Sequence, residues 1–128
     1  MRLLLDTCTF LWITAGAREL SSRARAAFQA PGNEVFLSAV SAWEIALKHG
    51  LGRLSLPEPP DRFVPTQRES HGIAPLFLDE ESVLHVQRLY ALHRDPFDRI
   101  LVCQAIVHGL TILSPDPLIA QYPARTLW

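Results

Sequence analysis

Five acidic residues are placed where a parallel sheet would bring them together: Asp6, Glu44, Asp95, Asp98 and Asp116. Each one follows a predicted strand or lies in the first turns of a predicted helix. Open α/β sheets carry their functional sites outside the carboxyl ends of the strands, so we expect these side chains to converge there. Neighbouring carboxylates repel one another, and all-oxygen ligands favour Mg²⁺ or Mn²⁺ over zinc or copper. The pattern therefore predicts a site for a hard divalent cation.

Each acid also has a purely structural interpretation. Ser41 and Glu44 have the spacing of a capping box, while Asp95 and Asp116 each precede a proline and fit helix N-caps. Asp6 ends a buried strand, where a carboxylate must be hydrogen-bonded, paired or metal-bound, although capping the next helix is an equal alternative. It is the combination of acids that indicates a metal site.

Other polar residues near the acids are candidates for supporting roles. The hydroxyls of Thr7, Ser38 and Ser114 could donate hydrogen bonds to the carboxylates or simply cap helices. Substrate phosphates would need nearby cations, and sequence proximity suggests Arg94, Arg99 and Lys48. The histidines are scattered at positions 49, 71, 85, 93 and 108, which does not fit a zinc site, and we expect ordinary surface or half-buried roles for them.

Strands and helices are predicted to alternate along the whole chain. Short apolar runs predict strands at 3–5, 35–37, 73–77 and 111–113, with an edge strand at 126–128. Helices are predicted at 7–14, 22–28, from 38 or 41 to 49, at 61–68 despite Pro65, from a cap at Asp79 to about 92, and from Asp95 to Gly109, with a short helix after Asp116. We expect one domain, 1–128, with a three-layer α/β/α sandwich and a mostly parallel central sheet.

The composition excludes several classes of protein. With 128 residues, 48% hydrophobic and 20% charged, the chain fits a single globular domain, and its net charge of −1 gives no basic field for nucleic acid. Cys8 and Cys103 lie in apolar stretches rather than in a disulfide pattern, so we expect a reducing, cytoplasmic setting. Asp6 interrupts the apolar start that would otherwise mimic a signal peptide, and no apolar run has the roughly 18 residues needed to span a membrane.

Four segments together resemble a known family. They are Leu4-Leu5-Asp6-Thr7 with Leu11-Trp12, Ser38-Ala39-Val40-Ser41-Ala42-Trp43-Glu44-Ile45-Ala46 with Lys48, His93-Arg94-Asp95-Pro96-Phe97-Asp98-Arg99 with Gln104-Ala105, and Leu113-Ser114-Pro115-Asp116. In this order they resemble the PIN-domain ribonucleases, and most closely the VapC-type toxins of prokaryotic toxin–antitoxin pairs. The resemblance covers essentially the whole chain.

The resemblance implies an endoribonuclease that depends on Mg²⁺ or Mn²⁺. Its catalytic, metal-binding acids would be Asp6, Glu44, Asp98 and Asp116, with Asp95 in a supporting role beside Thr7 and Ser114. It also implies an RNA substrate, a cognate VapB-like antitoxin whose C-terminal segment covers the acidic groove, and a homodimer. Two positions depart from the family pattern. Cys8 replaces the usual histidine, and Ser114-Pro115-Asp116 replaces a triplet with threonine, where Pro115 could shift Asp116.

Three other functions use acids at strand ends. A phosphatase of the haloacid-dehalogenase type needs a second aspartate two residues after the first, where this chain has Cys8. A receiver-like phosphoacceptor domain needs a lysine late in the chain, and the only lysine is Lys48. A catalytically silent PIN-type binding module is the remaining alternative, and the retained quartet of acids argues against it.

Overall fold

A wholly parallel five-stranded sheet lies at the centre of the computed structural model, which describes residues 1–128. The strands run in the order β3-β2-β1-β4-β5, and β1 pairs with both β2 and β4. Their bounds are β1 (Arg2–Leu5), β2 (Glu34–Ser38), β3 (Ala74–Leu76), β4 (Thr111–Leu113) and β5 (Arg125–Leu127). The predicted edge strand is present, and the carboxyl ends of all the strands lie on one side of the molecule.

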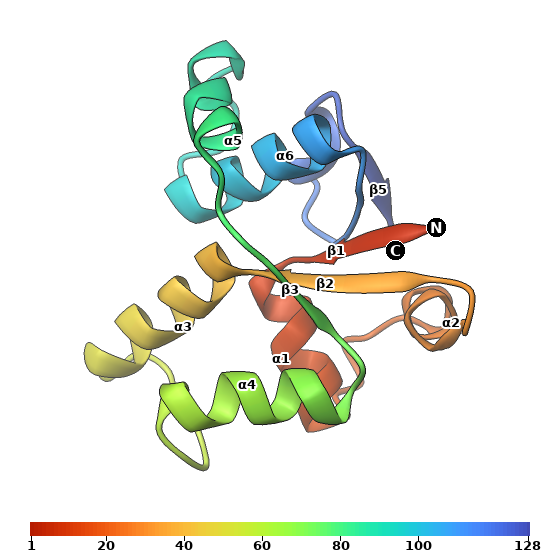
Figure 1. Ribbon diagram of the computed structural model, residues 1–128, viewed down its shortest axis with the longest axis vertical. Coiled ribbons are helices and arrows are strands. Elements are labelled where there is room, and N and C mark those ends of the chain that lie inside the picture. Colours follow the sequence, from red (N-terminus) through yellow and green to blue (C-terminus); the bar gives the residue numbers. More distant parts are fainter.

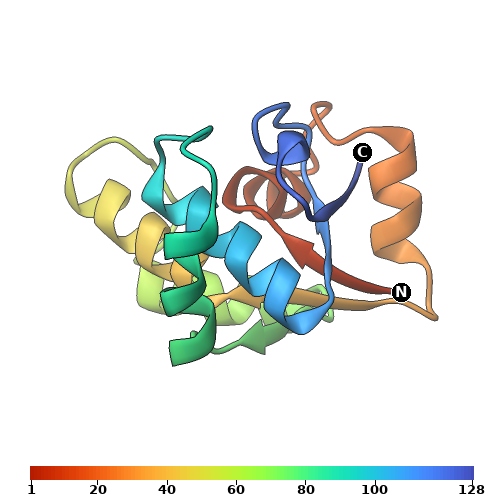
Figure 2. The same ribbon diagram turned by 90° about the horizontal axis from the view of Figure 1, so that it is seen from above.

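Helices cover both faces of this sheet and form the predicted three-layer sandwich (Figure 1). One face carries α5 (Glu80–His85) and α6 (Pro96–His108), and the other carries α1 (Thr7–Ala15), α2 (Ser22–Gln29) and α4 (Pro60–Ser70). The remaining helix, α3 (Ala39–Gly50), starts at the carboxyl end of β2 and contacts both α4 and α6. Short 3₁₀ turns follow at Val86–Arg88 and Ile119–Gln121. In Figure 2, α2 lies near the N-terminus and α3 extends from the opposite end of the sheet.

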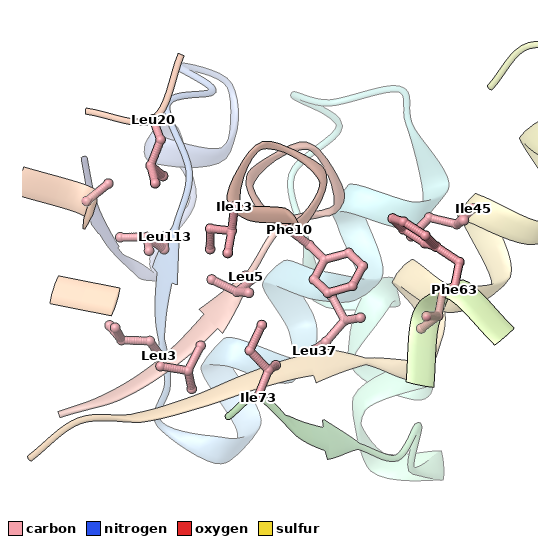
Figure 3. Close-up of a cluster of buried hydrophobic side chains, with 13 residues drawn as sticks. Leu3, Leu5, Phe10, Ile13, Leu20, Leu37, Ile45, Phe63, Ile73 and Leu113 are labelled. Carbon is pink, nitrogen blue, oxygen red and sulfur yellow. The ribbon is translucent and has the colours of Figure 1, made fainter. Parts of the chain in front are cut away.

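Successive side chains of β1 point to opposite faces of the sheet and enter two separate clusters of the core. Leu3 and Leu5 point to the cluster that contains Phe10 and Phe63, shown in Figure 3, where the two aromatic rings meet edge to face. Leu4 points to the opposite cluster, beside α6. A strand buried on both faces is typical of a parallel sheet between helices, and this burial fixes the end of β1 where Asp6 follows.

The structure differs from the predicted elements in two places that bear on the site. The helix predicted to reach about residue 92 ends at His85, a 3₁₀ turn continues it to Arg88, and Leu89 is extended. The carbonyl of Tyr90 accepts hydrogen bonds from the Arg99 guanidinium and the Tyr122 hydroxyl, so tertiary partners replace the helical hydrogen bond there. The short helix predicted after Asp116 is a single 3₁₀ turn. Pro65 lies inside a continuous α4, and no helix has the length and apolar character needed to cross a membrane.

Candidate metal centre

A cavity of about 390 Å³ opens at the carboxyl ends of the strands, and all five predicted acids line it. Its walls are formed by Asp6, Thr7, Cys8, Trp12, Glu44, Lys48, Asp95, Asp98, Pro115, Asp116 and Pro117. These residues come from the ends of β1 and β4 and from α1, α3 and α6. Sequence positions 6 and 116 meet because β1 and β4 are neighbours in the sheet.

Asp6 combines the two interpretations that the sequence left open. Its Oδ1 accepts a hydrogen bond of 2.8 Å from the backbone N–H of Thr9, so the side chain caps α1. The carboxylate is also buried, lines the cavity and has the Ser114 side chain as a further hydrogen-bond partner. Burial raises the pKa of Asp6, and repulsion from Asp116 adds to the increase. Asp6 therefore caps α1 and also places a carboxylate inside the cavity, where burial makes its negative charge unfavourable.

Glu44 is not part of a capping box. The N-cap of α3 is Ser38, whose hydroxyl accepts from the Val40 N–H and bonds the Gln104 side chain rather than an acid. Glu44 lies further along the helix, where Oε1 accepts a hydrogen bond of 2.6 Å from the Thr7 hydroxyl and Oε2 contacts the Lys48 ammonium. The carboxylate is therefore held in the cavity wall by a donor on each oxygen.

Asp95 and Asp98 stand side by side at the start of α6. Asp95 is the N-cap, and its Oδ1 accepts from the Phe97 N–H at 2.9 Å, as predicted. The pKa of Asp98 is raised to about 7, chiefly by burial and next by repulsion from Asp95, with smaller contributions from Asp6 and Glu44. The acids thus disfavour one another's charge, which is the condition that a bound divalent cation relieves.

Asp116 is joined to Asp98 by a residue that sequence reasoning missed, His93. Its Nε2 lies 2.8 Å from Oδ2 of Asp116 and 3.1 Å from Oδ2 of Asp98. The other oxygen of Asp116, Oδ1, accepts from the Leu118 N–H, and the Asp116 N–H donates to the Ser114 hydroxyl. The available signal was the position of His93 at the head of the His-Arg-Asp-Pro-Phe-Asp-Arg segment.

The three cations suggested for substrate binding have different surroundings. Arg99 donates to the carbonyl of Tyr90 at 3.0 Å and is within 3.3 Å of the Tyr122 hydroxyl, so its guanidinium holds the preceding loop. Lys48 pairs with Glu44 and lines the cavity. Arg94 is exposed and takes part in no ion pair.

Cys8 lines the same cavity without adding a charge to it. Burial raises the pKa of its thiol to about 11, and the nearby Asp6 and Glu44 carboxylates act in the same direction. The thiol is therefore neutral near pH 7, and the anionic donors of the cavity are all carboxylates. This donor set matches the hard-cation prediction made from the sequence.

Sequence comparison gives two matches. Residues 3–124 match the model of the PIN domain family. A stretch of 69 residues, 54% of the chain, is 39% identical to Ribonuclease VapC16 from Mycobacterium tuberculosis. The match spans about half, 49%, of that protein's length.

Solved structures with a similar fold come from toxin–antitoxin complexes. VapBC2 from Rickettsia felis, bound to a DNA fragment from their promoter, aligns with a TM-score of 0.73 at 12% identity, covering 99% of this chain and 98% of that one. VapBC-1 from nontypeable Haemophilus influenzae gives 0.65 at 14% identity, covering 99% and 97%. A toxin–antitoxin complex from Klebsiella pneumoniae gives 0.63 at 17%, covering 98% and 96%. At these identities the likeness concerns the fold.

Proposed function

The chain belongs to the PIN domain family, and we propose that it is a metal-dependent endoribonuclease that acts as the toxin of a toxin–antitoxin pair. The observation that carries the proposal is the meeting of five carboxylates in one cavity, where the pKa of Asp98 rises to about 7. Structural caps alone do not account for this arrangement, because Glu44 caps nothing and Asp98 is not the N-cap of its helix.

The donor set fits Mg²⁺ or Mn²⁺. We propose Asp6, Glu44 and Asp98 as ligands, with Asp116 completing the quartet. A divalent cation in such a site activates water and stabilises the charge that develops on the scissile phosphate. The chain's own residues prepare the site: Thr7 orients Glu44, Ser114 bonds both Asp6 and the Asp116 backbone, and Asp95 fixes the start of α6. These three are positioning residues.

RNA binding is proposed to be weak without the metal. The net charge of −1 gives little long-range attraction for a polyanion. Among the three cations, Arg94 is the best candidate for a phosphate contact, because Arg99 and Lys48 already bond protein oxygens. Both cysteines are free thiols, which suits the cytoplasm that we propose as the site of action.

An apolar groove beside the acids supports the proposed antitoxin partner. It is lined by Leu11, Trp12, Leu54, Leu56 and Phe63, among others, and Trp12 also lines the acidic cavity. One partner segment with apolar residues and a cation could therefore cover both. A homodimer is part of the same proposal, supported by the exposed Trp43 and Leu47 on α3 and by the exposed Leu51 at its C-cap.

The test is cleavage of single-stranded RNA by antitoxin-free protein in Mg²⁺, Mn²⁺, Ca²⁺ and EDTA, alongside hydrolysis of an aryl phosphate. We expect RNA cleavage with Mg²⁺ or Mn²⁺ only, and none by Asp6→Asn. Asp61→Asn is the matched control, because Asp61 is an exposed acid on α4 outside the cavity. Metal-dependent aryl phosphate turnover without RNA cleavage would favour a phosphatase. Inactivity on both substrates would favour a silent binding module.

A further inference from the structure

Nε2 of His93 lies close to two of the acids. The backbone N–H of Asp95 lies 3.1 Å from Nδ1 of His93 and can only donate, so Nδ1 accepts and the hydrogen of the ring is on Nε2. That nitrogen lies within hydrogen-bond distance of Oδ2 of both Asp98 and Asp116. The ring therefore donates to Asp116 and places the same nitrogen beside Asp98.

The loop that carries His93 is held in place independently of the acids. The backbone N–H of His93 donates to the hydroxyl of the buried Tyr122 at 2.8 Å. That hydroxyl and the Arg99 guanidinium both bond the carbonyl of Tyr90, at the other end of the same loop. The position of the ring is thus built into the fold by α6 and the segment after β4.

We propose that the cavity binds one divalent cation among the proposed ligands Asp6, Glu44, Asp98 and Asp116, and that the His93 N–H occupies the position a second cation would take between Asp98 and Asp116. This inference rests on the proposed function and specifies its metal stoichiometry. His93 is a positioning residue: its N–H donates to Oδ2 of Asp116 and lies beside Oδ2 of Asp98, two oxygens that would otherwise repel each other. Asp98 can still present Oδ1 to the ion, because its contact with His93 uses Oδ2.

A cation and the histidine hydrogen cannot share this gap. Mg²⁺ lies about 2.0–2.1 Å from its oxygen ligands, so an ion bridging the two Oδ2 atoms would meet the N–H that donates to Oδ2 of Asp116. The ring cannot act as a ligand through Nε2 in the tautomer that the Asp95 N–H imposes, because the lone pair needed for coordination is on Nδ1. Two-metal sites, by comparison, keep their ions about 3.5–4 Å apart on shared acids.

The experiment counts Mn²⁺ ions bound per chain, by isothermal titration and by the electron paramagnetic resonance of free Mn²⁺. The proteins are wild type, His93→Ala, His93→Gln and His85→Ala. Glutamine keeps a side-chain N–H donor at a similar reach, and His85, on α5, is a histidine without a hydrogen bond to any acid. We expect one ion for wild type, for His93→Gln and for His85→Ala, and two for His93→Ala.

Several results would overturn the inference. Two ions in wild type would do so whether or not the variants fold. In folded His93→Ala, a single ion at unchanged affinity would show that the ring does not compete with a cation, and loss of the first ion would make the ring a ligand. RNA cleavage by a two-ion wild type would leave the proposed function intact. Absence of both bound Mn²⁺ and RNA cleavage would instead overturn the proposed function, and this inference with it.

Discussion

The two sides of the acidic cavity are held by different means. Asp6 and Glu44 are anchored from the core, by the first turn of α1 and by the Thr7 hydroxyl, and the Glu44 side chain is only 6% exposed. Asp98 and Asp116 are more open, at 18% and 28%, and a single ring from a surface loop joins them. Asp6 and Glu44 form the core side of the cavity, which is a preformed part of the fold. Asp98 and Asp116 form its open side, which depends on His93 and the loop that carries it.

The largest expected effect comes from removing a charge on the core side. Asp6→Asn should lower RNA cleavage by more than the roughly 10–100-fold typical of losing a residue that only supports a ligand. The apo protein should melt at the same temperature or higher, because asparagine can still accept the Thr9 N–H while the costly buried charge is removed. Cleavage assays and thermal unfolding in EDTA check this. Joint loss of activity and folding would mean that Asp6 is chiefly structural.

The next effect concerns the donor that orients Glu44. Thr7→Val keeps the shape of a buried side chain and removes the hydroxyl that contacts both Glu44 and Ser41, so the free energy of unfolding should fall by about 1–3 kcal/mol. Thr14→Val is the matched control on the same helix, since its hydroxyl bonds only the carbonyl of Leu11. Urea unfolding compares the two. Equal losses would show that the contacts of the Thr7 hydroxyl with Glu44 and Ser41 add no stability beyond that of an ordinary helix hydroxyl.

On the open side, the half-buried Asp98 should make the stability of the apo protein depend on pH. The pKa of Asp98 rises from 3.8 to about 7 on folding, so the native state binds a proton that the unfolded chain has already released. Its contribution to stability is fully present below about pH 4 and is lost as the pH rises through about 7. Between about pH 8 and pH 5 wild type should gain on the order of 2 kcal/mol relative to Asp98→Asn. Urea unfolding in EDTA measures this difference. The prediction would be contradicted if the free energies of unfolding of wild type and Asp98→Asn changed equally between the two pH values.

The smallest effect is expected at the ion pair of Lys48 and Glu44. Lys48 is 44% exposed, and solvent screens such pairs, so Lys48→Met should change stability by less than about 1 kcal/mol. Its consequence should appear in Mn²⁺ affinity, which should rise slightly because one Glu44 oxygen loses its competing cation. Isothermal titration measures this change. A large loss of stability would place Lys48 among the anchors of the core side.

Local signals in the sequence predicted the helix caps better than the partners of the acids. The apolar run that ends at Asp6 and the caps at Asp79 and Asp95 are short-range patterns, and the structure contains them as predicted. Helix spacing alone could not separate a capping box from a buried acid at Glu44, because the deciding partner, Thr7, lies 37 residues away.

The role of the segment between α5 and α6 was not visible in the sequence for the same reason. Its hydrogen bonds go to Arg99 and Tyr122, and without those partners the pattern favours a longer helix. The local sequence around a histidine does not show which atoms its ring will contact. His93 acquires its two carboxylate partners only when β4 brings Asp116 beside α6.

The central position of β1 has a consequence for the order in which the chain can fold. Its neighbours are β2, about thirty residues later, and β4, more than a hundred residues later. Contacts so distant in sequence form late, because the entropy of closing the loop must be overcome first. On a ribosome, β1 and β2 can pair while Asp116 has yet to emerge. The acids of the cavity therefore meet only after Asp116 has left the ribosome, so a shorter nascent chain cannot assemble the complete quartet.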